Sequence, residues 1–331
     1  MPTKQKAKKA ADFEPISLQS LRLNTITSFD MYIQLSERER KGRFVLYRKK
    51  NIPFLEHARR NLAEHGTDIL YIDASDRKEY QLYLENNLEA IIQDVEISSA
   101  EKSKLAYSCA TGLVEELLEN PRSGEHVKRS KALISNLADY MLKDSQAFFN
   151  LVASSSFDYY TYTHSVNVAV FGIALAHRLG QYTQEMMKKI GSGLLLHDVG
   201  KGLIDKRILN KKGPLNESEW AIIKEHPENG AKLLHPSGQV SEEALTIIKG
   251  HHEKLDGSGY PHGLSGSAIH QCARIAAIAD IFDALTTRRP YRPAQSSFHA
   301  LKTMRNQMLA GLDPDLFREF VVLLGDQSPE A

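Results

Sequence analysis

Histidines and aspartates at wide intervals could form one metal centre in this chain. Two adjacent ligand types, His197 and Asp198, end an apolar run and are followed by Gly200 and Lys201. The other candidate ligands lie at predicted element ends or in apolar runs: His164, His226, His251, His252 and Asp280. A ligand set of imidazoles and carboxylates without cysteine suits iron, manganese or zinc. A lone histidine on an apolar helix is more often a packed residue, so the prediction rests on the joint placement of all seven.

A pair of bridged metal ions would suit hydrolysis of a phosphodiester. That reaction is slow because the charge of the diester repels hydroxide and because the leaving alkoxide is poor. Two metals can lower the pKa of a water that they share, neutralise the phosphate and orient the attack. At least one carboxylate must then bridge the metals, and the nucleophile is expected to be the hydroxide that they share.

The remaining histidines are expected to be ordinary core, surface or turn residues: His57, His65, His126, His177, His235, His262, His270 and His299. Asp283 follows Asp280 by three residues and lies on nearly the same face of the predicted helix. Two interpretations stay open for Asp283. It either supports a metal ligand from behind or is an acid on the helix surface.

Helices must position the seven residues. Periodicity and capping signals predict them over residues 79–95, 99–118, 126–152, 164–177, 183–197, 216–226, 241–252, 269–285, 297–309 and 313–324. Asn216 and Glu219 stand in capping-box register, and Pro227 suits the first turn of a further helix. Adjacent side chains on a helix point about 100° apart, so neighbouring ligands can bracket a metal pair only at a helix end. Both neighbouring pairs, 197–198 and 251–252, lie at predicted ends.

The N-terminal part has a mixed pattern. Strand composition at residues 31–35, 43–47 and 68–72, with a helix from Pro53 to near Gly66, predicts a small βαβ unit. Asp73 could be a phosphoacceptor, but a turn aspartate is favoured because the other acidic and lysine signals of a receiver domain are not evident. The predicted fold is mainly α. An all-helical bundle over residues 96–331 follows a small α/β module over 1–95, with residues 1–12 disordered and the module regulatory or dimerising.

Composition narrows the class of protein. The 331 residues are 42% hydrophobic, which suits two globular domains, and a net charge of +1 argues against bulk binding to nucleic acid. Cys109 and Cys272 form no C-x-x-C motif, which fits a reducing cytoplasm. No apolar signal region follows the basic start of the chain, and the longest apolar stretch is too short for a bilayer. A cytoplasmic protein with no membrane partner is therefore expected.

Eight short motifs follow one another in order, within a resemblance that extends over residues 99–325: Thr163-His164-Ser165, 197–201, 208–211, Glu225-His226-Pro227, His251-His252-Glu253, 256–261, 279–286 and 289–292. This series resembles the HD-GYP subfamily of HD-domain phosphohydrolases, which are bacterial signalling enzymes. The resemblance implies an HD-type helical fold with two or three non-haem metals, most often iron or manganese. It also implies hydrolysis of cyclic di-GMP to pGpG, in some members onward to GMP.

The resemblance also implies roles for individual residues. The seven candidates would be the ligands and Asp198 would bridge the metals. Lys201 would contact the scissile phosphate, and Arg289 and Tyr260 would contact substrate. The loop Gly259-Tyr260-Pro261 would shape the surroundings of the site and contact partners such as a GGDEF-type cyclase.

Two departures from the family pattern affect these expectations. In the family that this chain resembles, members with a third metal carry the pattern Glu-x-x-x-His. In this chain Tyr160 stands where that glutamate would be, four residues before His164. We therefore predict two metals, iron first with manganese or zinc as alternatives, and pGpG as the main product. After Lys201 the family usually runs Ile-Gly-Ile-Pro, whereas this chain has Gly202-Leu203-Ile204-Asp205. A differently shaped loop is expected there.

Three functions remain open at this stage. The leading one is a cyclic di-GMP phosphodiesterase, and a second keeps the metal chemistry but acts on another cyclic dinucleotide or nucleotide. The third is a catalytically weak sensor or scaffold, which Tyr160 and the altered loop would favour. The presence of all seven candidate ligands and Lys201 favours an enzyme. A homodimer is left open.

Overall fold

The structure is a computed structural model that describes residues 10–35, 43–155, 161–235, 238–288 and 293–325. Tyr160 and Arg289, both singled out in the sequence, lie outside these ranges. The chain divides into two compact units, residues 1–105 and 106–331. Within the described ranges, no helix combines the length and apolar character needed to cross a bilayer.

The first unit contains a four-stranded sheet in the order β1-β6-β3-β4. Its strands are β1 (Phe13–Ser17), β3 (Met31–Gln34), β4 (Phe44–Arg48) and β6 (Ile69–Asp73). Both β4 and β6 pair antiparallel with β3, so they run parallel to each other without being neighbours. Helix α1 (Glu56–Glu64) connects them by way of β5 (Pro53–Phe54), which pairs with β2 (Thr25–Ile26). The predicted strand–helix–strand order is present in this split form, and β1 was not predicted.

Helix α2 (Arg77–Gln93) packs its Tyr83 into the core of the first unit. Phe29 and Phe54 are fully buried in that core. The Tyr83 hydroxyl accepts a hydrogen bond from the backbone N–H of Arg22 at 2.7 Å. Asp73 caps a 3-10 turn, since its carboxylate accepts from the backbone and hydroxyl of Ser75. The turn interpretation of Asp73 therefore agrees with the structure. Residues 10–12 of the expected disordered tail form a short 3-10 helix.

Helices make up the second unit, and α3 (Ser99–Glu119) runs into it from the first. The others are α4 (Gly124–Lys143), α5 (Ala147–Ser154), α6 (Thr161–Arg178), α7 (Gln184–Leu196), α8 (Lys206–Leu209), α9 (Glu217–Lys224), α10 (His226–Leu234), α11 (Glu242–Gly250), α12 (Gln271–Thr286), α13 (Ser297–Thr303) and α14 (Pro314–Gly325). The mainly α fold that the sequence predicted is confirmed.

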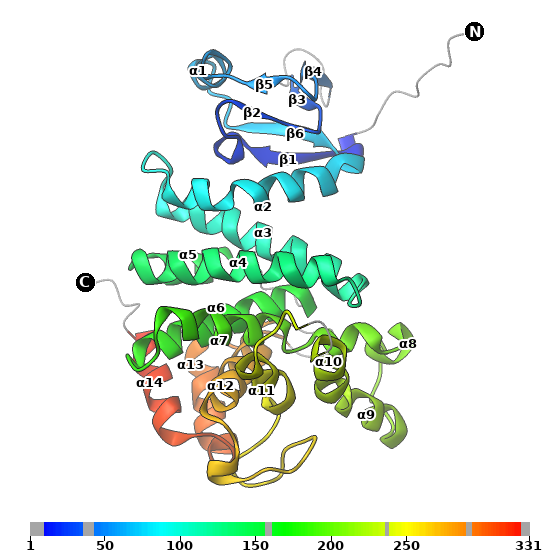
Figure 1. Cartoon of the computed structure of the whole chain (residues 1–331), viewed down its shortest axis with the longest axis vertical. Coiled ribbons are helices and arrows are strands. Elements are labelled where there is room, and N and C mark those ends of the chain that lie inside the picture. The colour runs from blue at the N-terminus through cyan, green and yellow to red at the C-terminus, as the bar shows by residue number, and fades with distance from the viewer. Residues whose placement is uncertain (1–9, 36–42, 156–160, 236–237, 289–292, 326–331) are drawn as a thin grey trace. The chain divides into compact units, whose positions relative to one another are not determined.

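Helices α6, α7, α11 and α12 pack against one another and form the scaffold of the second unit (Figure 1). Residues 163–176 of α6 are all buried, as its apolar sequence requires. Close approach of α6 and α7 depends on Gly172, where a Cβ would lie 2.6 Å from Leu194 Cδ1. These four helices carry most of the candidate ligands, so tight packing of the core also fixes the site.

Two predicted helices are interrupted. The helix expected over residues 126–152 is α4 and α5, because Asp144 adopts an extended backbone and its carboxylate accepts from the N–H of Gln146. The helix expected over 297–309 is α13 followed by a π-helical turn, Met304–Met308, and a 3-10 turn, Leu309–Gly311. The capping box of Asn216 and Glu219 is confirmed, as is the place of Pro227 in the first turn of α10.

Candidate metal centre

All seven predicted ligands converge in the second unit. Their ligand atoms form two groups, and within each group the atoms lie within 4.8 Å of one another. One group is His164, His197 and Asp280, and the other is Asp198, His226, His251 and His252. Neither group, among the described residues, includes any of the eight histidines that were expected to be ordinary.

Helix ends bring neighbouring ligands to the centre. His197 is the C-cap of α7 and His251 the C-cap of α11, as the geometric argument from the sequence required. A 3-10 helix, Val199–Leu203, follows α7 and packs against α10. Gly200 makes this contact feasible, because a Cβ there would lie 2.0 Å from the carbonyl oxygen of His226. The glycine thus lets His226, which opens α10, approach Asp198.

Asp198 faces both groups, one carboxylate oxygen to each. Its Oδ1 lies 3.2 Å from His226 Nε2 and 3.9 Å from His251 Nε2. Its Oδ2 lies 3.6 Å from His164 Nε2 and 3.4 Å from His197 Nε2. The side chain is completely buried. A carboxylate in this arrangement can hold two metal ions at once.

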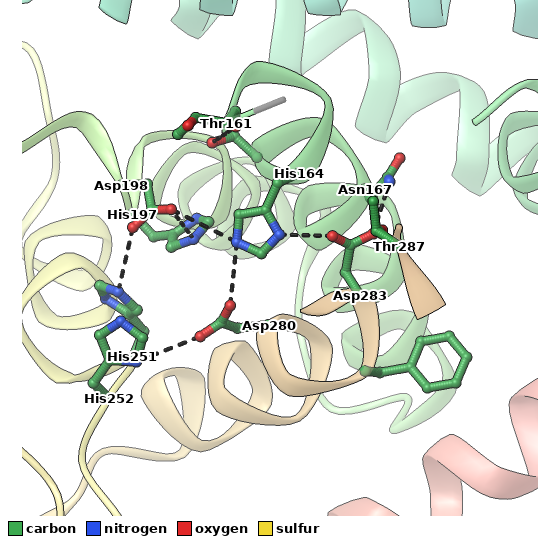
Figure 2. Close-up of polar contacts among 12 residues, drawn as sticks. Thr161, His164, Asn167, His197, Asp198, His251, His252, Asp280, Asp283 and Thr287 are labelled. Atoms are coloured by element: carbon green, nitrogen blue, oxygen red, sulfur yellow. Dashed lines mark hydrogen bonds and ion pairs between the residues drawn. The ribbon is translucent and has the colours of Figure 1, made fainter. Parts of the chain in front are cut away.

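Asp280, on α12, also contacts a histidine of each group. Its Oδ1 is 3.1 Å from His164 Nε2, and its Oδ2 is 3.4 Å from His252 Nδ1. Figure 2 shows Asp280 reaching from α12 between His164 and the pair His251 and His252. The two groups therefore form one centre with carboxylates on two sides.

Backbone carbonyls set the protonation of three imidazoles. In His197, His226 and His251, Nδ1 lies 2.7–2.9 Å from the carbonyl oxygen three residues earlier. A carbonyl can only accept, so each Nδ1 carries a proton, and Nε2, which faces the centre, is the nitrogen left to bind a metal. That is the tautomer that a metal ligand needs.

The donor set fits a bound cation. His226 Nε2 and His251 Nε2 are 3.2 Å apart, so two nitrogens able to bind a metal converge on one point. His197 Nε2, Asp198 Oδ1 and His252 Nε2 are buried with no hydrogen-bond partner. Buried polar atoms normally have partners, and an unpartnered cluster of this kind points to an ion. The residues present thus fit a bound metal ion.

The electrostatics of the centre favour ligand-ready forms. Burial acts to raise the pKa of Asp198, but Lys201 and His197 overcome it and hold that pKa well below its usual range. Burial, with the charges of neighbouring histidines, lowers the pKa of His251 well below its usual value. Burial lowers the pKa of His252 to about 3 although Asp280 opposes the shift. The aspartate is therefore ionised and both histidines are neutral near pH 7.

Asp283 supports a ligand from behind, and its burial excludes a helix-surface acid. Its Oδ2 accepts from His164 Nδ1 at 2.6 Å, which leaves His164 Nε2 for the centre (Figure 2). Its Oδ1 accepts from Asn167 Nδ2 at 2.7 Å and from the Thr287 hydroxyl at 3.1 Å. Asn167 Oδ1 in turn accepts from the Tyr107 hydroxyl at 2.8 Å. Spacing alone left Asp283 undecided, and nothing in the sequence pointed to Asn167 or Tyr107.

Lys201 lies between the centre and a cavity. Its Nζ donates to Asp198 Oδ2 at 2.6 Å. The cavity measures about 260 Å³, and its lining includes Lys201, Glu115, Tyr162 and Ile204. Gly202 packs closely on α3, since a Cβ would lie 2.8 Å from the carbonyl oxygen of Leu118. The unusual residues after Lys201 therefore shape the wall of this cavity.

The loop around Gly259 and Tyr260 folds back on the centre. A Cβ at Gly259 would lie 2.6 Å from the carbonyl oxygen of His252, and the N–H of Tyr260 donates to that oxygen at 3.2 Å. The Tyr260–Pro261 peptide is cis. The Tyr260 ring lies on His252, with centroids 4.6 Å apart, and burial raises the pKa of its hydroxyl.

Glu253 holds the loop after Tyr260 in place through hydrogen bonds to its backbone. Its carboxylate is buried and accepts from the backbone N–H groups of His262 and Leu264 at 2.7 and 2.9 Å. Sequence reasoning included Glu253 in a motif but assigned it no role. The available signal in the sequence was the position of Glu253 directly after two predicted ligands, His251 and His252.

Comparison with known families supports this interpretation of the site. The family model described as HD domain matches residues 146–316, more than half of the chain. The chain belongs to the HD-domain family. The matched segment of the HD domain contains all seven candidate ligands, and the family that the motifs predicted is confirmed.

Relatives of this HD-domain chain include enzymes named for cyclic dinucleotides. A cyclic di-GMP phosphodiesterase of Pseudomonas aeruginosa is 35% identical over 223 residues, covering 67% of this chain and 53% of the relative. A 3'3'-cGAMP-specific phosphodiesterase of Vibrio cholerae is 36% identical over 217 residues, covering 62% and 46%. The chain thus spans about half the length of these relatives.

A solved structure shares the fold. It is an HDG"Y"P protein from Bdellovibrio bacteriovorus with a TM-score of 0.64, and the match covers 95% of this chain and 100% of that one. The sequences are 20% identical, so this likeness concerns the fold alone.

Proposed function

We propose that this HD-domain chain hydrolyses cyclic dinucleotides, cyclic di-GMP first, at a centre of two metal ions. The observation that supports this proposal most directly is that the two carboxylate oxygens of buried Asp198 face separate groups of histidines. The names of the two relatives support the substrate class. Because a relative specific for 3'3'-cGAMP is as similar as one acting on cyclic di-GMP, 3'3'-cGAMP is the second candidate substrate.

The seven candidate ligands would hold the two metal ions in two sites. One metal would be held by His164, His197 and Asp280 and the other by His226, His251 and His252, with Asp198 shared by both. Two such ions, when bound, supply a water of lowered pKa and neutralise the phosphate charge. Histidines held by backbone carbonyls and by Asp283 need no reorientation to receive the ions, which strengthens binding.

Lys201 is the proposed phosphate contact and, with Asp198, belongs to the proposed catalytic set. Its ammonium lies at the border between the centre and the cavity, where a phosphate oxygen could replace part of its contact with Asp198. The cavity is smaller than most pockets that enclose a whole ligand, which measure roughly 300–1,000 Å³. It would take one portion of the substrate beside the scissile phosphate. Contacts from Arg289 and Tyr260 to the substrate remain proposals.

Several finer features also remain proposals. We expect two metals per chain, iron first with manganese or zinc as alternatives, and pGpG as the main product. Residues 1–95 are proposed to be a regulatory or dimerising module. A cytoplasmic location and a cyclase partner at the Gly259-Tyr260-Pro261 loop rest on the sequence alone, and the homodimer stays open.

The test is a product assay with measured metal content. The protein, loaded with iron(II), manganese or zinc, is incubated with cyclic di-GMP, 3'3'-cGAMP and cyclic di-AMP, and the products are separated by chromatography. We expect pGpG from cyclic di-GMP with two metals per chain. Tight binding of cyclic di-GMP without product from any nucleotide would instead favour a sensor. Three metals in active protein would contradict the predicted stoichiometry.

A further inference from the structure

Trp220 is an exposed aromatic residue that packing of the helical core does not explain. It lies on α9, none of whose residues is buried, and 45% of its surface is exposed. It is the only tryptophan of the chain. Single exposed apolar residues are common on proteins, so exposure alone is weak evidence. The neighbours of Trp220 are what make it informative.

A series of ring contacts connects Trp220 to the metal centre. Its ring meets that of Tyr260 edge-to-face, with centroids 6.1 Å apart and planes at 75°. The Tyr260 ring lies over His252 with centroids 4.6 Å apart and planes at 32°. His252 belongs to one of the two ligand groups. Trp220 is therefore two ring contacts away from a proposed metal ligand, on the exposed side of the centre.

The backbone that carries Trp220 is held in place before any ligand arrives. Asn216 and Glu219 form a capping box at the start of α9, and the N–H of Trp220 donates to the carbonyl of Asn216 at 2.9 Å. Lys211 Nζ donates to both carboxylate oxygens of Glu219, at 2.5 and 2.8 Å. A fixed aromatic surface loses little conformational entropy when it binds a ligand.

We propose that Trp220, together with Tyr260, is a stacking platform for a purine base of the substrate. This inference rests on the proposed cyclic dinucleotide substrate, whose two bases must lie outside the buried centre when a phosphate is at the metals. Every base has a π face, so stacking contributes affinity with little choice between bases. Trp220 therefore strengthens binding of guanine and adenine nucleotides alike, and selection among cyclic dinucleotides lies elsewhere in the site.

The sole tryptophan makes binding directly measurable. Metal-loaded full-length protein is titrated with cyclic di-GMP, GMP, AMP and inorganic phosphate while its intrinsic fluorescence is followed. Stacking on a purine quenches indole emission, so all three nucleotides are expected to reduce the signal saturably. Inorganic phosphate, which has no base, is expected to leave it unchanged. Equal responses to phosphate and nucleotide, or no response to any nucleotide, would overturn the platform.

Kinetics of variants give a second readout. Trp220→Ala is expected to raise KM for cyclic di-GMP about five- to 150-fold, with a smaller change in kcat and unchanged metal content. Trp220→Phe keeps an aromatic face and is expected to recover most of the affinity. Phe298→Ala is the matched control, because Phe298 is 72% exposed and its ring contact is with His299. An unchanged KM in Trp220→Ala would contradict the inference.

Different results would contradict the stacking platform and the proposed phosphodiesterase activity. Product formation with unaltered fluorescence and a normal KM in Trp220→Ala would leave the phosphodiesterase standing and remove the platform. Saturable quenching by nucleotides with no product would support the platform and remove the hydrolytic function. Neither quenching nor product would remove both.

Discussion

His226 and His251 are buried, and a backbone carbonyl fixes each ring. His252 faces Asp280 on one side, and its ring also contacts Tyr260, which in turn contacts the exposed Trp220. We call the first set, with His164, His197 and Asp198, the inner centre. His252, Tyr260 and Trp220 form the rim. The inner centre is held by directional hydrogen bonds to atoms of the protein. The rings of the rim contact one another, and the rim is partly open to solvent.

This difference suggests a division of labour. Metal ligands must keep one tautomer and one direction, which hydrogen bonds to carbonyls and carboxylates enforce. A substrate with flat bases needs accessible π surface, which the rim supplies. Changes in the inner centre, or at the proposed ligand His252, should therefore alter metal affinity first, and changes at Tyr260 or Trp220 should alter substrate affinity first.

The largest effect is expected from Asp198→Asn. An amide has one acceptor oxygen, so it cannot offer a charged oxygen to each histidine group. Metal content should fall below two per chain, and kcat should drop by about a thousandfold or more. Elemental analysis and the product assay measure both, with circular dichroism as the check on folding. The control is Asp315→Asn, whose side chain is 82% exposed. Full metal content in Asp198→Asn would contradict the proposal that Asp198 is a ligand shared by both metals.

A smaller loss is expected from Asp283→Asn, which leaves every direct ligand in place. An asparagine has one acceptor oxygen. If that oxygen accepts from His164, its NH2 group faces the Asn167 and Thr287 donors and those hydrogen bonds are lost. Metal affinity should weaken about 10- to 100-fold, the usual cost of losing such support. Competition with a chelator measures the affinity. Asp313→Asn is a matched control, since Asp313 accepts from Arg274 and from the backbone of α14. If affinity stays normal, His164 is positioned by other contacts.

The smallest effect on metal affinity is expected from Tyr107→Phe. This change removes the hydroxyl that donates to Asn167 Oδ1, a hydrogen bond worth about 0.5–1.5 kcal/mol net. Metal affinity should fall about two- to tenfold, with KM for cyclic di-GMP altered less than in Trp220→Ala. Tyr182→Phe removes a comparable hydroxyl bond to Gln271 and should not change metal affinity. A larger shift in KM than in metal affinity would contradict the separation of inner centre and rim.

Local signals in the sequence were sufficient to find the candidate ligands. His197 and His251 could be placed at helix ends because glycine and charged residues follow them, and those ends are confirmed. The capping box at Asn216 was equally readable. The break at Asp144 was missed because apolar periodicity continues on both sides of it. Strand β1 was missed because its pairing with β6 joins segments more than fifty residues apart.

Residue types, their order and the helices that carry them were thus determined by the sequence itself, because these depend on short-range periodicity and capping. Only the tertiary structure decided which atoms meet. Asp283 supports His164 across 119 positions, and His226 meets His251 across 25. The two oxygens of Asp198 reach separate groups because four helices pack together, and Trp220 reaches Tyr260 because of where α9 packs. Such contacts arise from packing between segments distant in the chain, and no local pattern encodes them.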